Sequence, residues 1–119
     1  MQAAALTTGS YSVVTSMSAT VWRSWQLAET YTPAECLGVH ACDIPVLRIG
    51  SDPAAIDPIG ELCRQARELD QSRSIMLGCA AMARFAEPLA VRLGVPVIDG
   101  VVAATLLAEA VVALPTFSR

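Results

Sequence analysis

Short apolar segments alternate with segments of helical periodicity along this chain, and that alternation constrains the fold more than any other feature. Four segments have the length and composition of strands, at residues 11–15, 36–41, 75–77 and 95–98. Helical segments follow them at about 18–31, from 51–53 or 57–58 to about 70, at 87–93 and at 101–114. This pattern is typical of a parallel sheet with right-handed crossovers and helices on both faces. The sequence therefore predicts an α/β fold, a three-layer αβα domain around a four-stranded parallel sheet.

The predicted strand order is 2-1-3-4, in which the direction of winding reverses between the first and third strands. Ligands bind at such a reversal, in the crevice outside the carboxyl ends of the strands. Thr15 and Ser16 end the first strand, and Cys79 and Ala80 follow the third after a single glycine. We therefore expect these two segments, far apart in sequence, to converge at one edge of the sheet.

Helical spacing also predicts which faces are buried. In the helix at about 18–31, the predicted core positions are Val21, Trp22, Trp25 and Ala28, and Ser16 or Ser18 is expected to cap its amino terminus. In the helix that ends near residue 70, they are Ile59, Leu62, Cys63, Ala66 and Leu69. Residues 44–47 are expected to be a connection or an edge segment, because a proline cannot donate to a central ladder. Residues 81–86 are expected to form a short turn, with Gly94 capping the helix that follows.

Composition limits the classes of partner. The chain has 119 residues, which suits one domain, and its apolar fraction of 54% suggests surfaces buried against something else. The helix at 101–114 is apolar nearly all round, so another domain or subunit is expected to cover it. The net charge is −3 and the basic residues, all arginines, are scattered, so no nucleic-acid partner is expected. The absence of lysine excludes Schiff-base chemistry and a phosphate-loop lysine.

Four cysteines are irregularly spaced, at Cys36, Cys42, Cys63 and Cys79, with no Cys-x-x-Cys pair. With only one histidine in the chain, no zinc or other metal site is expected. His40 itself is expected to be structural, since no adjacent acid orients it. The first nine residues are too short and polar for a secretory signal, and the apolar run at 101–114 is shorter than the roughly 20 residues that cross a bilayer. A soluble cytoplasmic protein with reduced thiols and no membrane partner is therefore expected.

Cys79 has two interpretations. A buried cysteine behaves as a small hydrophobe, but a thiol at a strand end that faces a helix amino terminus has its pKa lowered and can react. Nucleophilic attack, redox work and proton transfer at carbon are the three chemistries open to it. A phosphatase loop needs Cys-x5-Arg, whereas Arg84 follows Cys79 at Cys-x4-Arg. Redox work usually has a resolving cysteine nearby and none lies in the motif, so proton transfer at carbon remains.

Four segments together resemble the Asp/Glu/hydantoin racemase family, and the hydantoin racemases within it most. They are residues 11–16, ending in Val-Thr-Ser; 43–47, Asp-Ile-Pro-Val-Leu; 77–83, Leu-Gly-Cys-Ala-Ala-Met-Ala; and 94–101, Gly-Val-Pro-Val-Ile-Asp-Gly-Val. Members of the family are about twice as long and have two similar α/β halves. The resemblance implies that residues 1–119 form a single α/β domain like the carboxyl-terminal half.

The resemblance implies racemisation without a cofactor, by two cysteines on opposite faces of the substrate's α-carbon. Cys79 matches the second of them, Thr15 and Ser16 match a hydroxyl-bearing strand end near the substrate, and the backbone at Cys79 and Ala80 matches an anion-binding segment. The family motif that carries the first cysteine has no match at the other three cysteines. Ala81 replaces a more usual glycine and is expected to narrow the pocket.

Three functions remain open on this basis. The first is a racemase acting on a small molecule, a hydantoin or an amino acid. The second is an inactive relative that associates with itself through residues 101–114, and a homo-oligomer is expected in either case. The third is one-sided protonation by a single thiol, as in related decarboxylases.

Overall fold

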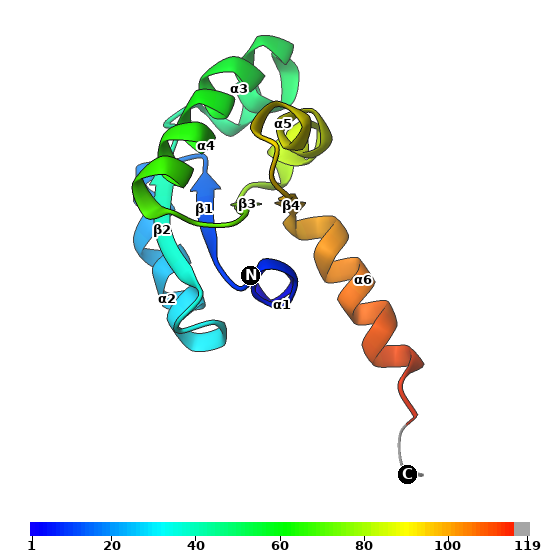
Figure 1. Ribbon diagram of the computed structural model, residues 1–119. Helices are drawn as coiled ribbons and strands as arrows, with labels where there is room; N and C mark the ends of the chain where they lie inside the picture. The colour runs from blue at the N-terminus through cyan, green and yellow to red at the C-terminus, as the bar shows by residue number, and fades with distance from the viewer. Residues whose placement is uncertain (116–119) are drawn as a thin grey trace.

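The computed structural model describes residues 1–115 and contains a four-stranded parallel sheet in the order β2-β1-β3-β4 (Figure 1). Its strands are β1 Tyr11–Thr15, β2 Cys36–Ala41, β3 Ile75–Leu77 and β4 Val97–Asp99. Its α-helices are α1 Gln2–Thr8, α2 Val21–Tyr31, α3 Val46–Ser51, α4 Ile56–Asp70, α5 Ala86–Leu93 and α6 Gly100–Ala113. The predicted α/β class, parallel sheet and strand order are confirmed. Residues 116–119 of the predicted domain lie outside the described part.

The central strand β1 is buried at every position because helices cover both faces of the sheet. On one face, Val14, Ile75 and Leu77 pack against the buried side of α4 and α5. On the other face, Tyr11 and Val13 pack against Ala4 of α1. Figure 1 shows α6 leaving the body at β4 and extending away from both layers. The edge strand β4 is half-buried along its whole length.

Several predicted boundaries are confirmed. Residues 80–85 form a 3-10 turn before α5, and Gly94 ends α5 with a positive φ of 67°. Ile59, Cys63 and Ala66 are fully buried along α4.

Four predictions about these elements are wrong. Residues 46–51 form the helix α3, because Pro45 precedes the first turn, where its fixed φ and missing N–H are tolerated. Trp22 is 61% exposed, because α2 buries only Ala28. Leu69 is 77% exposed, because the carboxyl-terminal turn of α4 presents Asp70 to the sheet instead. The expected serine cap on α2 is also absent: Thr20 holds that position without a side-chain hydrogen bond.

A buried polar cluster lies where the end of α4 meets the sheet. Oδ2 of Asp70 accepts a hydrogen bond from the Ser12 hydroxyl at 2.7 Å and lies 2.7 Å from Nε2 of His40. The Ser12 hydroxyl is also 2.7 Å from that of Ser72. The expectation that no acid orients His40 is wrong, because α4 brings Asp70 across 30 positions of sequence. The cluster joins α4 to β1 and β2.

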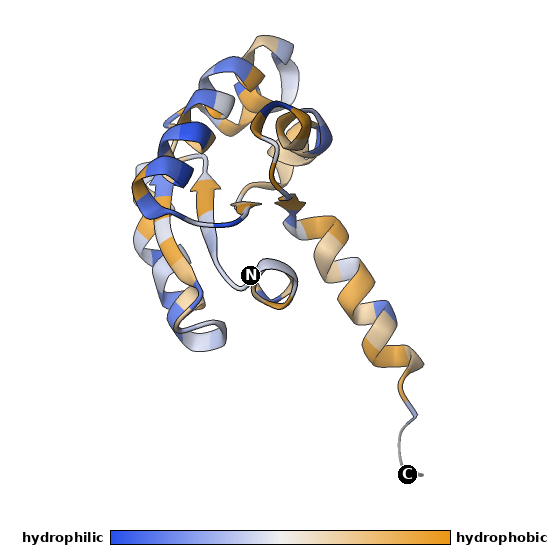
Figure 2. Cartoon of the chain, in the orientation of Figure 1, coloured by the Kyte–Doolittle hydropathy of each residue, from blue (hydrophilic) through white to orange (hydrophobic). Residues whose placement is uncertain are grey.

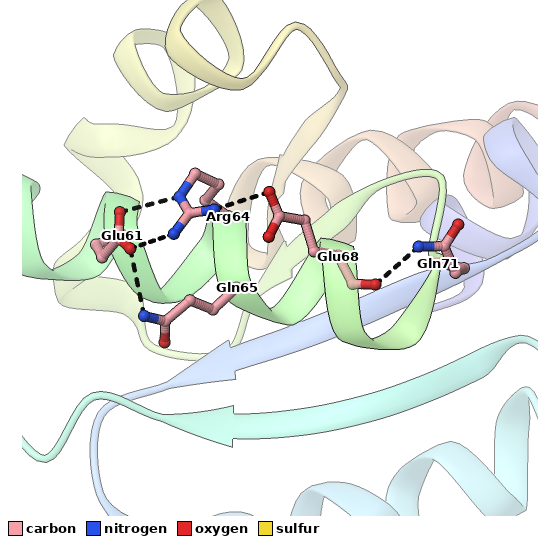
Figure 3. A network of polar contacts seen from close by, with 5 residues as sticks. All are labelled: Glu61, Arg64, Gln65, Glu68 and Gln71. Atoms are coloured by element: carbon pink, nitrogen blue, oxygen red, sulfur yellow. Dashed lines mark hydrogen bonds and ion pairs between the residues drawn. The ribbon is translucent and has the colours of Figure 1, made fainter.

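The outer side of α4 carries a different network, which Figure 3 shows. Arg64 pairs with Glu61 one turn before it and donates to Glu68 one turn after it, at 2.7 Å. Gln71 donates to the backbone carbonyl of Glu68 at 2.8 Å. Exposed pairs of this spacing contribute only a few tenths of a kcal/mol each. They support the helix, while the buried face positions it.

Candidate functional site

Cys79 lies just past the carboxyl end of β3, in extended backbone with φ −133° and ψ 127°. Gly78 donates its N–H to the carbonyl of Val14 at 2.8 Å, which extends the pairing of β3 with β1 up to the cysteine. The carbonyl of Cys79 then accepts from Met82 at 3.0 Å and starts the 3-10 turn Ala80–Phe85. The thiol therefore stands at a fixed point between a strand and a tight turn.

Gly78 allows the two predicted segments to approach. A Cβ at this position would lie 3.1 Å from Cγ1 of Val13 and 3.2 Å from Cβ of Thr15, closer than ordinary packing permits. The end of β1 thus packs directly against the backbone that precedes Cys79, as the topology predicts. The side chains are less accessible than expected: Thr15 is 3% exposed and Ser16 6%. The Thr15 hydroxyl lies 3.4 Å from that of Thr20.

A small pocket of about 170 Å³ opens at the carboxyl ends of β3 and β4. Cys79 and Ala80 line one side and Asp99 and Val101 line the other. Thr15 and Ser16 are not among its lining residues, so the pocket lies one strand away from the crevice predicted between β1 and β3. The structure brings Cys79 and Ala80 into one concave site, whereas Thr15 and Ser16 are buried and do not line it.

Asp99 is a polar residue of this pocket that the sequence reasoning missed. It ends β4, and its Oδ1 accepts the N–H of Val101 at 3.0 Å, which caps the first turn of α6. Asp99 stands at a strand end, as Cys79 does, so the rule that ligand-binding groups lie at strand ends could have identified it from the sequence. Its carboxylate gives the pocket a hydrogen-bond acceptor opposite the thiol.

Asp43 is a second missed residue, and it orders the loops beside the site. Its carboxylate accepts hydrogen bonds from the Ser18 N–H at 2.8 Å and from the Ser18 hydroxyl at 2.8 and 2.7 Å. Hydrogen bonds from the Ser18 side chain and backbone lower the pKa of Asp43. With a positive φ of 55°, Asp43 turns the chain after β2 so that it holds the segment that follows β1.

Burial disfavours the thiolate form of the other three cysteines. Burial raises the pKa of Cys63 to about 12, and it also raises the pKa of Cys42 and of Cys36. Cys42 lies near the site, with its Sγ 3.6 Å from the carbonyl oxygen of Ser16, but does not line the pocket. Within residues 1–115, no group of three or more metal-type side chains comes together.

Alkylation provides a first test of which thiol reacts. Because the thiolate is the reacting species, a raised pKa slows the reaction of Cys36, Cys42 and Cys63 near neutral pH. We expect iodoacetamide at pH 8 to modify Cys79 first and Cys63 last, measured by mass spectrometry of peptides over time. Modification of Cys36 or Cys42 ahead of Cys79 would contradict the accessibility of the pocket thiol.

Known proteins resemble this chain in sequence. A family profile described as Asp/Glu/Hydantoin racemase matches residues 1–108. A hydantoin racemase from Pseudomonas sp. (strain NS671) is 44% identical over 79 residues, which are 66% of this chain and 32% of that protein. A hydantoin racemase from Rhizobium meliloti is 36% identical over 104 residues, which are 84% of this chain and 42% of that protein. The chain thus spans well under half the length of these curated relatives.

Solved structures resemble it as well. The allantoin racemase from Klebsiella pneumoniae superposes with a TM-score of 0.86 at 36% identity, over 94% of this chain and 46% of that one. The allantoin racemase from Pseudomonas fluorescens superposes with a TM-score of 0.83 at 34% identity, over 99% of this chain and 56% of that one. With the profile matching nearly the whole chain, the protein belongs to the Asp/Glu/hydantoin racemase family.

Proposed function

We propose that this protein takes part in cofactor-independent racemisation of a small molecule, with Cys79 as an acid–base thiol. The observation that carries the proposal is the position of Cys79 at a strand end, in a pocket it shares with Ala80 and Asp99. A thiolate there can remove a proton from an acidic carbon when the oxygen that gains charge finds donors. The backbone at Cys79 and Ala80 is the proposed source of those donors.

The proposed substrate class is a hydantoin or a related ring, with an amino acid as the alternative. Hydantoins and allantoin, which the relatives' names give as their substrates, share a five-membered ring in which a C–H carbon adjoins a carbonyl and an N–H. The carbonyl makes the carbon acidic, and the N–H can donate to the Asp99 carboxylate. A pocket of about 170 Å³ has room for such a ring only if its substituent extends outward.

The proposed chemical step is the removal of a proton from the ring carbon and its replacement on the opposite face. The Cys79 thiolate takes the proton, so an S–H bond forms, the C–H bond breaks, and its electron pair moves to the carbonyl oxygen as an enolate. A second group then delivers a proton to the opposite face of the carbon. Thr15 at the end of β1 and Ser16 just after it are both buried, and they are proposed to support the backbone donors on this face.

The proposal includes a cytoplasmic location and a homo-oligomeric state. The four cysteines are unpaired, which suits the reducing conditions of the cytoplasm. A homo-oligomer is proposed because α6 exposes apolar side chains that a second copy could cover.

Two other functions remain as candidates, each favoured by one observation. The exposed apolar surface of α6 favours a self-associating relative without activity. The presence of one thiol in the pocket favours one-sided protonation, as in decarboxylase-type relatives.

Deuterium exchange at the ring carbon distinguishes the three. In heavy water, with a panel of single-enantiomer hydantoins, allantoin and amino acids, a racemase incorporates deuterium into both enantiomers as optical rotation is lost. A one-sided enzyme incorporates it into one enantiomer and keeps the rotation. An inactive relative matches the buffer alone. We expect the first result with a hydantoin, read by NMR and polarimetry, and either of the others contradicts it.

A further inference from the structure

The two turns that approach each other at the candidate site leave the core where their strands end. Strands β1 and β3 are held by burial: Figure 2 shows hydrophobic residues in both, and Val14 and Leu77 belong to one core cluster. The chain is exposed at residues 17–20 after β1, and at Gly78 and Ala80 after β3. Burial of the strands therefore does not by itself fix the position of either turn.

The segment that follows β2 and includes α3, residues 42–51, holds the turn after β1. The N–H of Cys42 donates to the carbonyl of Thr15 at 3.0 Å, and the Asp43 carboxylate accepts from both the N–H and the hydroxyl of Ser18. Neither α2 nor the short 3-10 turn before it has a side-chain cap of its own. Asp43 supplies, from another part of the chain, the acceptor that this helix start lacks.

The same segment holds the turn that begins at Cys79. Nη2 of Arg84 donates to the carbonyl of Ile49, in the last turn of α3, at 2.7 Å. The last carbonyls of a helix have no partner within it, and an arginine is a suitable donor to them. The Arg84 guanidinium also lies 4.7 Å from the centroid of the Phe85 ring, and Phe85 and Ile49 belong to one core cluster. Arg84, whose spacing from Cys79 excludes a phosphatase loop, thus ties the Cys79 turn to α3.

The helix α6 also packs against the turn after β3. Figure 2 shows α6 hydrophobic along nearly its whole length, and within residues 1–115 no helix is long and apolar enough to cross a bilayer. Apolar contacts are not directional, so they do not fix the orientation of a backbone. Within the described residues, the Arg84 hydrogen bond is the only one that a side chain makes between this turn and another element.

We propose that Asp43 and Arg84 are positioning residues for the proposed reaction, which fasten the turns after β1 and β3 to one segment of the chain. The inference rests on the proposed function, because what they position is the Cys79 thiol and the backbone donors at Cys79 and Ala80. Neither residue lines the pocket, so each acts through the turn it holds. The end of β1 packs against Gly78, so a shift of either turn displaces the backbone at the thiol. A displacement of about 1 Å is enough to lower the rate of a chemical step.

The amide of Met82 reports on the contact made by Arg84, because it is buried and donates to the carbonyl of Cys79 at 3.0 Å. Arg84→Met keeps the aliphatic stem and removes the donor, whereas Arg84→Lys keeps a charged donor. In hydrogen–deuterium exchange followed by NMR, we expect Met82 to exchange at least about tenfold faster in Arg84→Met, and within about threefold of the wild type in Arg84→Lys. The amides on the buried face of α4 should keep their wild-type rates, since the core is unchanged.

Arg48→Met is the matched control on α3 itself. The Arg48 side chain is exposed and pairs with Asp52, four residues along, at 3.6 Å. Its replacement removes an arginine from the same helix without touching the turn after β3. We expect both Met82 and the α4 amides to exchange as in the wild type.

The role in the reaction is tested by separating kcat from KM. At Asp43, glycine accepts the φ of 55° but has no carboxylate, and asparagine accepts that φ and keeps an oxygen acceptor. With a hydantoin in the ring-carbon exchange assay, we expect kcat to fall at least about tenfold in Asp43→Gly and Arg84→Met, with KM within about twofold. Asp43→Asn and Arg84→Lys should restore kcat to within about threefold of the wild type. Unchanged α4 amides exclude a loss of folded protein as the cause.

Each other result counts against a stated part of the inference. Unchanged Met82 exchange in Arg84→Met, or equally fast exchange in Arg48→Met, overturns the link between Arg84 and the turn. A kcat near that of an active wild type in Asp43→Gly or Arg84→Met overturns the positioning role of that residue and leaves the racemisation standing. A wild type that exchanges no ring proton overturns the proposed function and the positioning role with it. The Met82 measurement needs no substrate, so it still decides whether Arg84 holds the turn.

Discussion

Replacing Cys79 with serine should reduce deuterium exchange at the ring carbon of a hydantoin by about 100-fold to 10,000-fold. The serine hydroxyl fits the space of the thiol, so the pocket keeps its shape. A hydroxyl is a much weaker acid than a thiol, however, so almost no anion is available to remove the proton. The measurement is the initial rate of exchange by NMR, in heavy water, with the non-enzymatic rate subtracted.

Cys42→Ser is the matched control for this change. Cys42 lies near the site, against the carbonyl of Ser16, but outside the pocket, and burial raises its pKa. We expect its exchange rate to stay within about threefold of the wild type. Equal rates for Cys79→Ser and the wild type would eliminate Cys79 as the acid–base group. If only Cys42→Ser lost exchange, Cys42 would be the acid–base group instead.

The sheet was predictable because strand and helix periodicities alternate cleanly in the sequence. Parallel strands need helical crossovers. Residues 11–15 are apolar enough to be covered on both faces, which places β1 in the middle of the sheet. From that topology alone, Cys79 and the end of β1 were expected to meet. The structure confirms their approach through the Gly78 hydrogen bond to Val14.

Other features depended on contacts that periodicity does not encode. The pairing of His40 with Asp70 joins a strand to a helix end, and nothing near either residue in sequence indicates the other. The exposure of Trp22 follows from how little of α2 meets the sheet. The pocket lies beside β4 rather than β1 because the end of β1 is closed by its own packing against Gly78.

The buried cluster beneath α4 yields the second prediction of large effect. Gly38 pairs with Ser12 across β1 and β2, and a Cβ at Gly38 would overlap the carboxylate of Asp70. Gly38→Ala must therefore displace Asp70 from Ser12 and His40, and leave buried polar groups without their partner. We expect a loss of about 2–4 kcal/mol in the free energy of unfolding and a fall of roughly 10 °C in Tm, measured by denaturant and thermal unfolding.

Gly50→Ala is the control, because a Cβ there meets nothing within 4 Å and the residue lies in α3. That change should be neutral or stabilise the protein by up to about 1 kcal/mol, since alanine favours a helix over glycine. If Gly38→Ala were equally harmless, the Asp70 carboxylate could not occupy the space above Gly38.

A double-mutant cycle separates this overlap from the general cost of changing a strand residue. Asp70→Ala removes the acceptor of Ser12 and His40, but it also removes a negative charge from the carboxyl-terminal turn of α4, where the helix dipole disfavours one. In the Asp70→Ala background, Gly38→Ala has no carboxylate to displace, so its cost should fall to about 1 kcal/mol or less. The two changes together should therefore cost about 1–3 kcal/mol less than the sum of each alone. Strict additivity would mean that Gly38 is required for another reason, and that the cluster does not set the approach of α4 to the sheet.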